Sequence, residues 1–278
     1  MYSIALSAVA LLATLLPTTL AQTHTDCNPL NTTGCPDMPA LGGNATFQFN
    51  DTWNPELWVK KNKGEAKWTS NGTAFTVGYR GDAPYIASSF YIFFGRVEVI
   101  MRAAPGQGII SSAILQSECL DEIDWEFKGG DTKHVATNYF GKGHDKIVEG
   151  EPLRGKDFEM KSPPQDDFHN YTLDWTKERI QWWLDGEMLR ELKFADAKGG
   201  AEYPQTPMNI RIGAWSGGDT ENNPEDTVKW AGGATNFDDA PFTMMVQRVY
   251  AIDYTSAKTY SWADMDSSGS FEKVKVIK

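Results

Sequence analysis

Beyond its first 21 residues, the sequence lacks any apolar run long enough to cross a membrane. Residues 1–21 are the exception: they carry no charge, contain a long apolar stretch broken by Pro17, and end in a small residue before Gln22. This pattern predicts a secretory signal peptide, although the usual basic residue near the start is missing; a membrane anchor is the alternative. We therefore expect a protein secreted to the extracellular space or the cell wall, with no transmembrane segment in its mature chain.

Basic residues are outnumbered throughout the chain. Its 278 residues include 26 basic and 37 acidic ones, which gives a formal net charge of −11 at pH 7. This surplus of negative charge disfavours nucleic acid and anionic membrane surfaces as partners, because both are negatively charged themselves. A neutral polymer or a small molecule fits the charge better, although plain solubility would explain it as well.

Cysteine is also scarce, with three residues in the chain. Cys27 and Cys35 lie close together around a segment rich in Pro, Asn, Thr and Gly, so we pair them in a disulfide bond, which an oxidising compartment permits. Cys119 then remains free, and a small buried apolar residue describes it better than a nucleophile, because no histidine neighbours it. Five Asn-X-Ser/Thr sequences suit a secreted glycoprotein. They begin at Asn31, Asn44, Asn50, Asn71 and Asn170.

Helical periodicity is rare, and short runs of alternating apolar and polar residues take its place. Examples are GRVEVIMRA (95–103) and YTLDW (171–175). Asp185-Gly186 follows the run RIQWWL and is a strong signal for a β-hairpin. Many closely spaced strands, without an internal repeat or a linker, predict a single domain over residues 22–278. Its expected fold is all-β, an antiparallel β-sandwich.

The stretch LDEIDWEF (120–127) carries carboxylates at alternate positions, Glu122, Asp124 and Glu126. In a β-strand these side chains share one face, about 6.6 Å apart, while the apolar residues between them point to the core. Like charges so close should raise the pKa of at least one group, so that it stays protonated while its neighbours ionise. Acid–base chemistry at a glycosidic bond needs this combination, and two glutamates in line suit a retaining mechanism. A solvated acidic face and a Ca²⁺ site are the alternatives.

Side chains typical of sugar binding occur near this strand and later in the chain. Asn138 and Tyr139 occupy the next candidate strand, and Trp215 lies in GAWSGGD, where two glycines would admit a ligand. Aromatic faces stack on sugar rings, and amides bind hydroxyl groups. The expected substrate-binding residues are Gln116, Asn138, Tyr139, Arg211, Trp215 and Thr227. Three other tryptophans alternate like core residues, namely Trp125, Trp175 and Trp182.

These segments resemble a known family. DEIDWEF resembles the Glu-x-Asp-x-Glu signature of glycoside hydrolase family 16, and its flanks resemble the fungal Crh-type cell-wall transglycosylases. The likeness spans nearly the whole mature chain through CNPL, APGQGIISSAILQS, TNYFGKG, YPQTPMNIRIGAWSGGD, VKWAGG and YSWADMDSSGSFEKVKV. It implies a jelly-roll, concanavalin-like sandwich with a concave substrate cleft. It also implies that Glu122 is the nucleophile, Glu126 the general acid/base, and Asp124 the residue that orients and tunes them.

The resemblance implies an activity as well. Enzymes of this kind cut chitin and rejoin it to β-1,3-glucan or chitin, so we expect a retaining transglycosylase with some hydrolysis. We expect it to act as a monomer, without a cofactor or a metal ion. Two positions depart from the family pattern: Ala136 stands where a polar residue is common, and Cys119 where an acidic or polar residue is expected. The alternatives are an endo-β-1,3(4)-glucanase on the same fold and a carbohydrate-binding lectin, although a lectin does not need three carboxylates.

Overall fold

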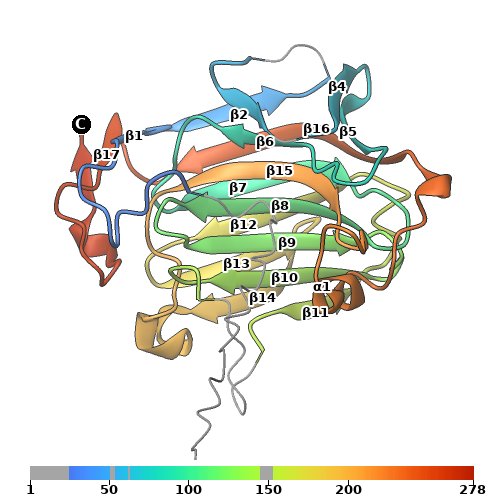
Figure 1. The fold of residues 1–278 in the computed structure, drawn as a ribbon. Coiled ribbons are helices and arrows are strands. Elements are labelled where there is room, and N and C mark those ends of the chain that lie inside the picture. The colour runs from blue at the N-terminus through green and yellow to red at the C-terminus, as the bar shows by residue number, and fades with distance from the viewer. Residues whose placement is uncertain (1–24, 51–53, 62, 145–152) are drawn as a thin grey trace, which may run out of the picture.

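The computed structural model describes residues 25–50, 54–61, 63–144 and 153–278 (Figure 1). The predicted signal peptide, residues 1–21, lies outside this part of the chain.

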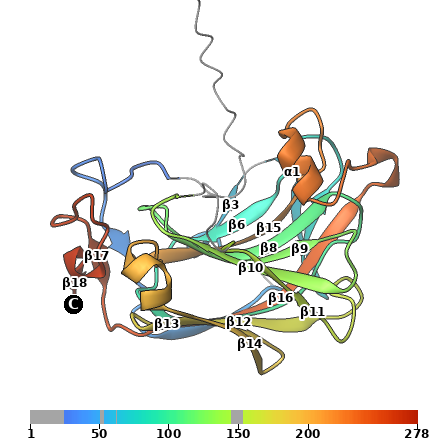
Figure 2. The ribbon, with the colours of Figure 1, turned by 90° about the horizontal axis from the view of Figure 1, so that it is seen from below.

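Two antiparallel β-sheets face each other and form a sandwich, as Figure 2 shows from below. In pairing order, the seven-stranded sheet contains β11 (Lys156–Glu159), β10 (His134–Phe140), β9 (Glu122–Lys128), β8 (Ile109–Ser117), β15 (Met208–Ser216), β6 (Tyr85–Ser88) and β3 (Trp58–Lys61). The eight-stranded sheet contains β14 (Glu187–Lys193), β13 (Arg179–Leu184), β12 (His169–Trp175), β7 (Gly95–Arg102), β16 (Phe242–Asp253), β5 (Gly72–Val77) and β4 (Glu65–Thr69), with β2 (Asn44–Gln48) paired to β16. This architecture confirms the predicted antiparallel β-sandwich.

The remaining elements are short and lie outside the two large sheets. A third sheet contains β1 (Met38–Pro39), β17 (Thr259–Ser261) and β18 (Lys275–Ile277). The helical segments are α1 (Glu225–Trp230), η1 (Phe194–Asp196), η2 (Lys198–Gly200), η3 (Phe237–Asp239) and η4 (Phe271–Lys273). Within the described ranges, no helix is long and apolar enough to cross a lipid bilayer. In Figure 2, α1 stands on the side of the seven-stranded sheet that points away from the sandwich.

The core lies between the two large sheets, and strand alternation decides which side chains enter it. In β7 every second residue is buried, so Val97, Val99 and Met101 face the other sheet while Arg96 and Glu98 face outward. Three tryptophans predicted to lie in the core are confirmed there, namely Trp125, Trp175 and Trp182. Truncating a buried side chain of this size to alanine typically costs about 3–5 kcal/mol of folding free energy.

The predicted hairpin at Asp185-Gly186 is confirmed as the turn between β13 and β14. The φ angles of the two residues are 49° and 85°. A two-residue type I′ turn requires this left-handed conformation at both positions, and aspartate followed by glycine adopts it with little strain. Leu184 and Glu187 pair directly across the turn. The hairpin fixes the first pairs of β13 and β14, and a register shift between Trp182 and Trp183 then pairs Trp182 with Arg190, which directs Arg190 inward.

The cysteines divide as predicted. Cys27 and Cys35 form a disulfide bond with a Cα–Cα distance of 5.7 Å, within the usual range for such a bond. Cys119 is free and fully buried. Burial, reinforced by the nearby Asp121 carboxylate, raises the pKa of its thiol to about 12. A thiol that stays protonated and inaccessible is a poor nucleophile, so Cys119 acts as a core residue.

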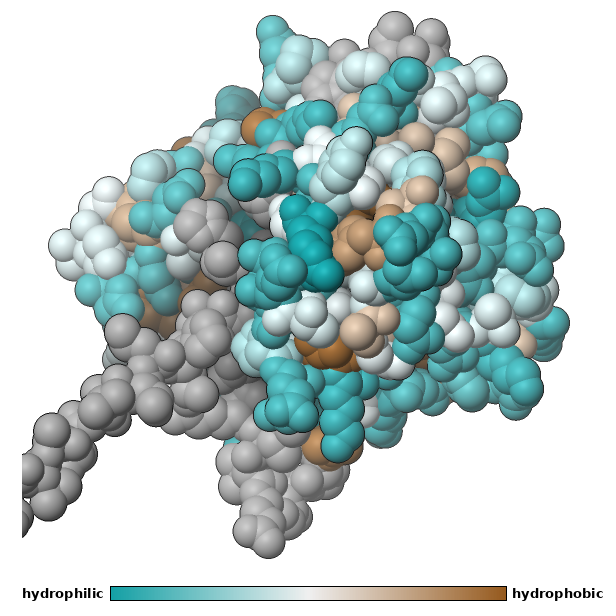
Figure 3. Space-filling view, turned by 45° about the vertical axis from the view of Figure 1, so that its right-hand side comes forward, coloured by the Kyte–Doolittle hydropathy of each residue, from teal (hydrophilic) through white to brown (hydrophobic). Residues whose placement is uncertain are grey.

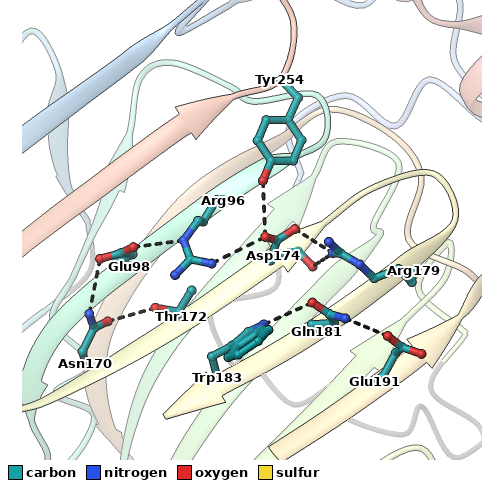
Figure 4. A network of polar contacts seen from close by, with 10 residues as sticks. All are labelled: Arg96, Glu98, Asn170, Thr172, Asp174, Arg179, Gln181, Trp183, Glu191 and Tyr254. Carbon is teal, nitrogen blue, oxygen red and sulfur yellow. Dashed lines mark hydrogen bonds and ion pairs between the residues drawn. The ribbon is translucent and has the colours of Figure 1, made fainter. Parts of the chain in front are cut away.

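The outer face of the eight-stranded sheet carries a network of paired polar side chains (Figure 4). Asp174 accepts hydrogen bonds from Arg96, Arg179 and Tyr254. Asn170 donates to Glu98 and accepts from Thr172. This network occupies the side of the molecule opposite to β9. Hydrophilic residues also predominate on the surface shown in Figure 3, where hydrophobic residues form small separate patches.

Candidate active site

The three acidic residues of LDEIDWEF all point away from the sandwich on β9. The apolar residues between them are at most 1% exposed and enter the core. We call the opposite face of the seven-stranded sheet the site face, and Glu122, Asp124 and Glu126 the carboxylate row. Glu122 is 7% exposed, Asp124 is 1% exposed and Glu126 is half-buried. The row is therefore largely shielded from water, unlike an ordinary solvated acidic face.

Strand register brings three of the predicted substrate-binding residues onto the site face. Side chains directly opposite each other in an antiparallel pair point to the same side of the sheet. Gln116 of β8 is paired with Glu122, and Asn138 of β10 is paired with Asp124. Arg211 of β15 lies two strands from Asp124 in the same cross-strand line, and it is 5% exposed. Gln116, Asn138 and Arg211 therefore lie on the same face of the sheet as the carboxylate row.

Tyr139 does not reach the site face. It follows Asn138 directly in β10, so strand alternation turns its side chain to the opposite side. Its partner across the strands is Ile123, and its ring is 7% exposed within the hydrophobic core. The expectation that Asn138 and Tyr139 both contact substrate conflicts with the alternation of a single strand. The ring packs instead against the guanidinium group of Arg190, 5.5 Å away.

The two positions that depart from the family pattern differ in their relation to the site. Ala136 is paired with Glu126 on the site face, so a methyl group stands where a polar side chain would border the carboxylate. Cys119 lies in the turn between β8 and β9, and its side chain is buried in the core. Only Ala136 is therefore placed to influence a ligand directly.

Trp215 lies on the site face but is covered by α1. It is 8% exposed and packs with Ile110 and Ala231 in a small cluster separate from the main core. Trp230 of α1 stacks over it, with 6.3 Å between ring centroids and 19° between ring planes. Trp230 itself is 38% exposed, and Nζ of Lys128 lies 5.6 Å from its ring centroid. Trp230 is therefore the ring that a ligand would meet first.

Trp230 was missed from the sequence, although a signal existed. It stands in VKWAGG, where a tryptophan precedes two glycines as Trp215 does in GAWSGGD. The predicted residue Thr227 lies one turn earlier on the same helix and is half-buried. Its carbonyl accepts a hydrogen bond from the Ala231 N–H at 2.9 Å, which closes the helix end beneath Trp230. Thr227 thus borders the site face through α1.

Asp124 is stabilised in its protonated form. Burial raises its pKa well above the usual value, and the charges of Glu122 and Glu126 raise it further. A hydrogen bond to Glu122 also favours the protonated form, while the more distant Arg190 opposes it. Both side-chain oxygens of Asp124 are shielded from solvent and meet no hydrogen-bond donor among the described residues. A neutral acid that donates to Glu122 fits this environment better than a carboxylate.

Glu126 is also held protonated near neutral pH. Burial raises its pKa to about 8, and the charge of Glu122 adds to this effect. Lys128 lowers the pKa in part, and Asp157 of β11 raises it. A carboxylic acid with such a pKa can donate a proton at neutral pH, which an ordinary glutamic acid cannot. The expected separation of roles within the row therefore has a physical basis at Glu126.

Two contacts from outside β9 fix the position of the row. Asp121, fully buried just before Glu122, accepts hydrogen bonds from the N–H groups of Lys142, Gln205 and Thr206 at 2.9–3.0 Å. These bonds hold the turn that leads into the strand. From the core side, Nε1 of Trp182 donates to the main-chain carbonyl oxygen of Asp124 at 3.0 Å. Side chains on both sides of β9 thus limit its movement, which a catalytic pair requires.

Within the described part of the chain, no group of three or more His, Cys, Asp or Glu side chains is arranged to hold a metal ion, the carboxylate row included. A cavity of about 600 Å³ lies away from β9, and it contains none of the predicted site residues. Its lining consists of Lys177, Glu178, Arg179, Glu191, Lys193, Phe194, Ala195 and Phe271.

The β-sandwich and its row of tuned carboxylates define a protein of the glycosidase and transglycosylase class. The family model for glycosyl hydrolases family 16 matches residues 46–232. The chain belongs to this family. It is 48% identical over 266 residues to Crh-like protein 2 of Botryotinia fuckeliana. The matched region covers 95% of this chain and 57% of that protein. The chain thus spans little more than half the length of this relative.

Solved structures agree with this family. The Crh5 transglycosylase in complex with NAG is 43% identical and superposes with a TM-score of 0.83, covering 90% of this chain and 99% of the other. The apo Crh5 transglycosylase gives a TM-score of 0.82. A Bacillus licheniformis β-glucanase, 24% identical over 76% of this chain with a TM-score of 0.60, shares the fold. The predicted jelly-roll fold and the predicted enzyme class are confirmed.

Proposed function

We propose that the protein is an extracellular, retaining transglycosylase that cleaves chitin and transfers it to β-1,3-glucan or chitin, with some hydrolysis. The observation that carries the proposal is the carboxylate row on β9, in which burial and Glu122 raise the pKa of Glu126 to about 8. The likeness to the Crh5 transglycosylase supports transfer rather than hydrolysis alone. The disulfide bond between Cys27 and Cys35 supports an oxidising, extracellular environment.

In the first step, the Glu122 carboxylate attacks the anomeric carbon of the donor sugar. The bond from this carbon to the glycosidic oxygen breaks, and the leaving oxygen takes the proton of Glu126. The donor is then bound covalently to Glu122, and Glu126 is a carboxylate. Protonation of the leaving group is possible at neutral pH because the pKa of Glu126 is high.

In the second step, the Glu126 carboxylate removes a proton from an incoming hydroxyl group. The oxygen of that group attacks the anomeric carbon and displaces Glu122, so the enzyme returns to its starting protonation state. A sugar hydroxyl gives transfer, and water gives hydrolysis. Asp124, a neutral acid beneath both groups, donates to Glu122 and orients it without bonding to the sugar.

The remaining site-face residues are assigned to substrate binding. Gln116 and Asn138 present amides for sugar hydroxyls beside Glu122 and Asp124, and Arg211 continues the line on β15. The α1 segment supplies Trp230 as a stacking platform, supported from below by Trp215 and bordered by Thr227. Chitin as donor is supported by the likeness to a Crh5 structure that contains NAG.

A fluorescent acceptor assay tests the proposed function. The protein is incubated with chitin as donor and a fluorescent β-1,3-glucan oligosaccharide as acceptor, with Glu122→Gln as the inactive control. Transfer predicts fluorescent product of high mass with the wild type and none with the variant. Short unlabelled oligosaccharides alone would identify a hydrolase such as an endo-β-glucanase. Binding without any change in the polymer would identify a lectin.

A further inference from the structure

Arg190 is a cation buried in the interior of the sandwich. It lies on the edge strand β14, points inward and is 6% exposed. Its Nη1 donates to the carbonyl oxygen and Oγ1 of Thr137 at 3.0 and 2.8 Å, and its Nη2 donates to the carbonyl oxygen of Arg154 at 2.7 Å. All three acceptors are neutral, and none of the described carboxylates forms an ion pair with it. Burying a charge in this way costs free energy, so a compensating interaction is needed.

The guanidinium group lies directly behind the strands of the site. Thr137 is paired with Trp125, the residue between Asp124 and Glu126. The guanidinium carbon lies 4.5 Å from the ring centroid of Trp182, the same side chain whose Nε1 donates to the Asp124 carbonyl. Arg190 therefore touches both β10 and the tryptophan that holds β9. It brings a positive charge to the core side of a sheet whose other side bears three carboxyl groups.

We propose that Arg190 is a positioning residue for the reaction: its hydrogen bonds hold β10 beside β9, and its positive charge, acting through the sheet, weakens the hold of Asp124 on its proton. The proposal rests on the proposed function, because it assigns Arg190 to the same reaction. Mutual attraction between Arg190 and Asp124 opposes the effect of burial on the pKa of each group. Arg190 nonetheless keeps its proton, since burial lowers its pKa only to about 10.

Other charged groups act on the same carboxylates and must stay constant in any test. The pKa of Asp124 depends on charged groups of β9 and β14, and the pKa of Glu126 depends on charged groups of β9 and β11. Besides the members of the row, the charged groups that act on the pKa values of Asp124 and Glu126 are Lys128, Asp157 and, from behind the sheet, Arg190. Those that act on the pKa values of Arg190 and its neighbour Tyr139 are Asp124, Arg154, Lys198 and Glu202.

The test is the pH dependence of kcat/KM in Arg190→Gln, Arg190→Met and Arg190→Lys, measured on any β-glycan that the wild type cleaves. At an effective dielectric constant of about 20, a unit charge changes a pKa by about one unit across a separation on the order of 10 Å. We expect the acidic limb of the profile, set by Glu122 and its partner Asp124, to move upward in Arg190→Gln and Arg190→Met. Arg190→Lys keeps the charge, so its profile should coincide with that of the wild type even if the variant melts earlier.

Arg179→Gln serves as the matched control, because Arg179 is an ion-paired arginine on the outer face of the same sheet. It should leave the profile unmoved. An unshifted acidic limb in the neutral variants of Arg190, or an equal shift in Arg190→Lys, would overturn the proposal. If chitin proves not to be a substrate, the proposed function fails. The pH profiles of the Arg190 variants and the wild type, measured on another β-glycan, still decide the role of Arg190.

A double-mutant cycle keeps the proposal testable if the neutral variants are unstable. Stability is measured by denaturant unfolding at pH 9 for Arg190→Gln with and without Asp124→Asn. If the two charges interact, removing Arg190 costs less stability once Asp124 cannot ionise. Equal losses in both backgrounds, or equal failure to fold, would show a purely structural role and refute the proposal.

Discussion

Glu126→Gln should stabilise the protein at alkaline pH while abolishing glycan cleavage. In the folded protein the pKa of Glu126 is raised from 4.5 to about 8 by burial and by Glu122. Between these values the folded protein holds a proton that the unfolded chain has released. The stability associated with that proton is therefore fully present below pH 4.5 and is lost as pH rises through 8. Glutamine cannot ionise, so the variant avoids this loss.

The size of the effect follows from the pKa difference. A shift of about 3.5 units at about 1.36 kcal/mol per unit corresponds to about 5 kcal/mol at pH 9, an upper bound for a half-buried group. For a domain of this size, 1 kcal/mol changes Tm by about 2–4 °C. We therefore expect Glu126→Gln to melt higher than the wild type at pH 9, by at most about 10–20 °C, and at the same temperature at pH 4.

Melting curves of both proteins from pH 4 to pH 9 measure this difference. Glu65→Gln is the control, because it makes the same chemical change at an exposed position on β4, far from β9. Groups that do not interact with Glu126 cancel, so the difference reports the titration of Glu126 together with its neighbours Glu122 and Asp124. Equal Tm values for Glu126→Gln and the wild type at every pH would show that the pKa of Glu126 is not raised. Its role as the acid would then have no basis.

Three further predictions follow from the site and the surface. Because Glu126 must be protonated in the first step, kcat/KM should fall as pH rises through about 8, and a rate that is flat to pH 10 would contradict the assignment. Trp230→Ala should weaken binding of chitin oligosaccharides with little change in Tm. Trp215→Ala should instead lower the free energy of unfolding in denaturant by roughly 3–5 kcal/mol, because its buried ring supports α1. The reverse pattern would contradict the assignment of Trp230 as the outer ring and Trp215 as its support. Peptide mass mapping should find Asn170 without a glycan, since its amide is bonded to Glu98 in the middle of a sheet, and an occupied Asn170 in a protein of normal stability would be the opposing result.

Strand alternation explains how much of the site was predictable. The spacing of Glu122, Asp124 and Glu126 determines that they share a face as soon as a strand forms, and the core position of Trp125 follows from the same rule. The same rule also separates Tyr139 from Asn138. Tyr139 was expected at the site because tyrosine is a residue type common in sugar binding, without regard to the two-residue alternation of side chains along the strand.

Contacts between distant segments could not be predicted in the same way. Trp215 was expected to contact substrate, but α1 folds back over it, and nothing within GAWSGGD encodes that cover. Arg190 stands in GEMLREL beside exposed residues, and its inward direction depends on the register shift between Trp182 and Trp183 opposite it. The electrostatic environment of Glu126 likewise depends on Asp157 of β11, which is joined to β9 through β10 only in the folded chain.

The account depends most directly on a retaining mechanism at Glu122 and Glu126, and the anomeric configuration of the first product tests it. Proton NMR can follow a soluble chito-oligosaccharide in the first minutes of cleavage, before mutarotation mixes the anomers. Attack by Glu122 followed by attack of water or a sugar inverts the anomeric carbon twice, so the new reducing end should appear as the β anomer. Initial release of the α anomer would mean a single displacement and would contradict the assignment of Glu122 as nucleophile.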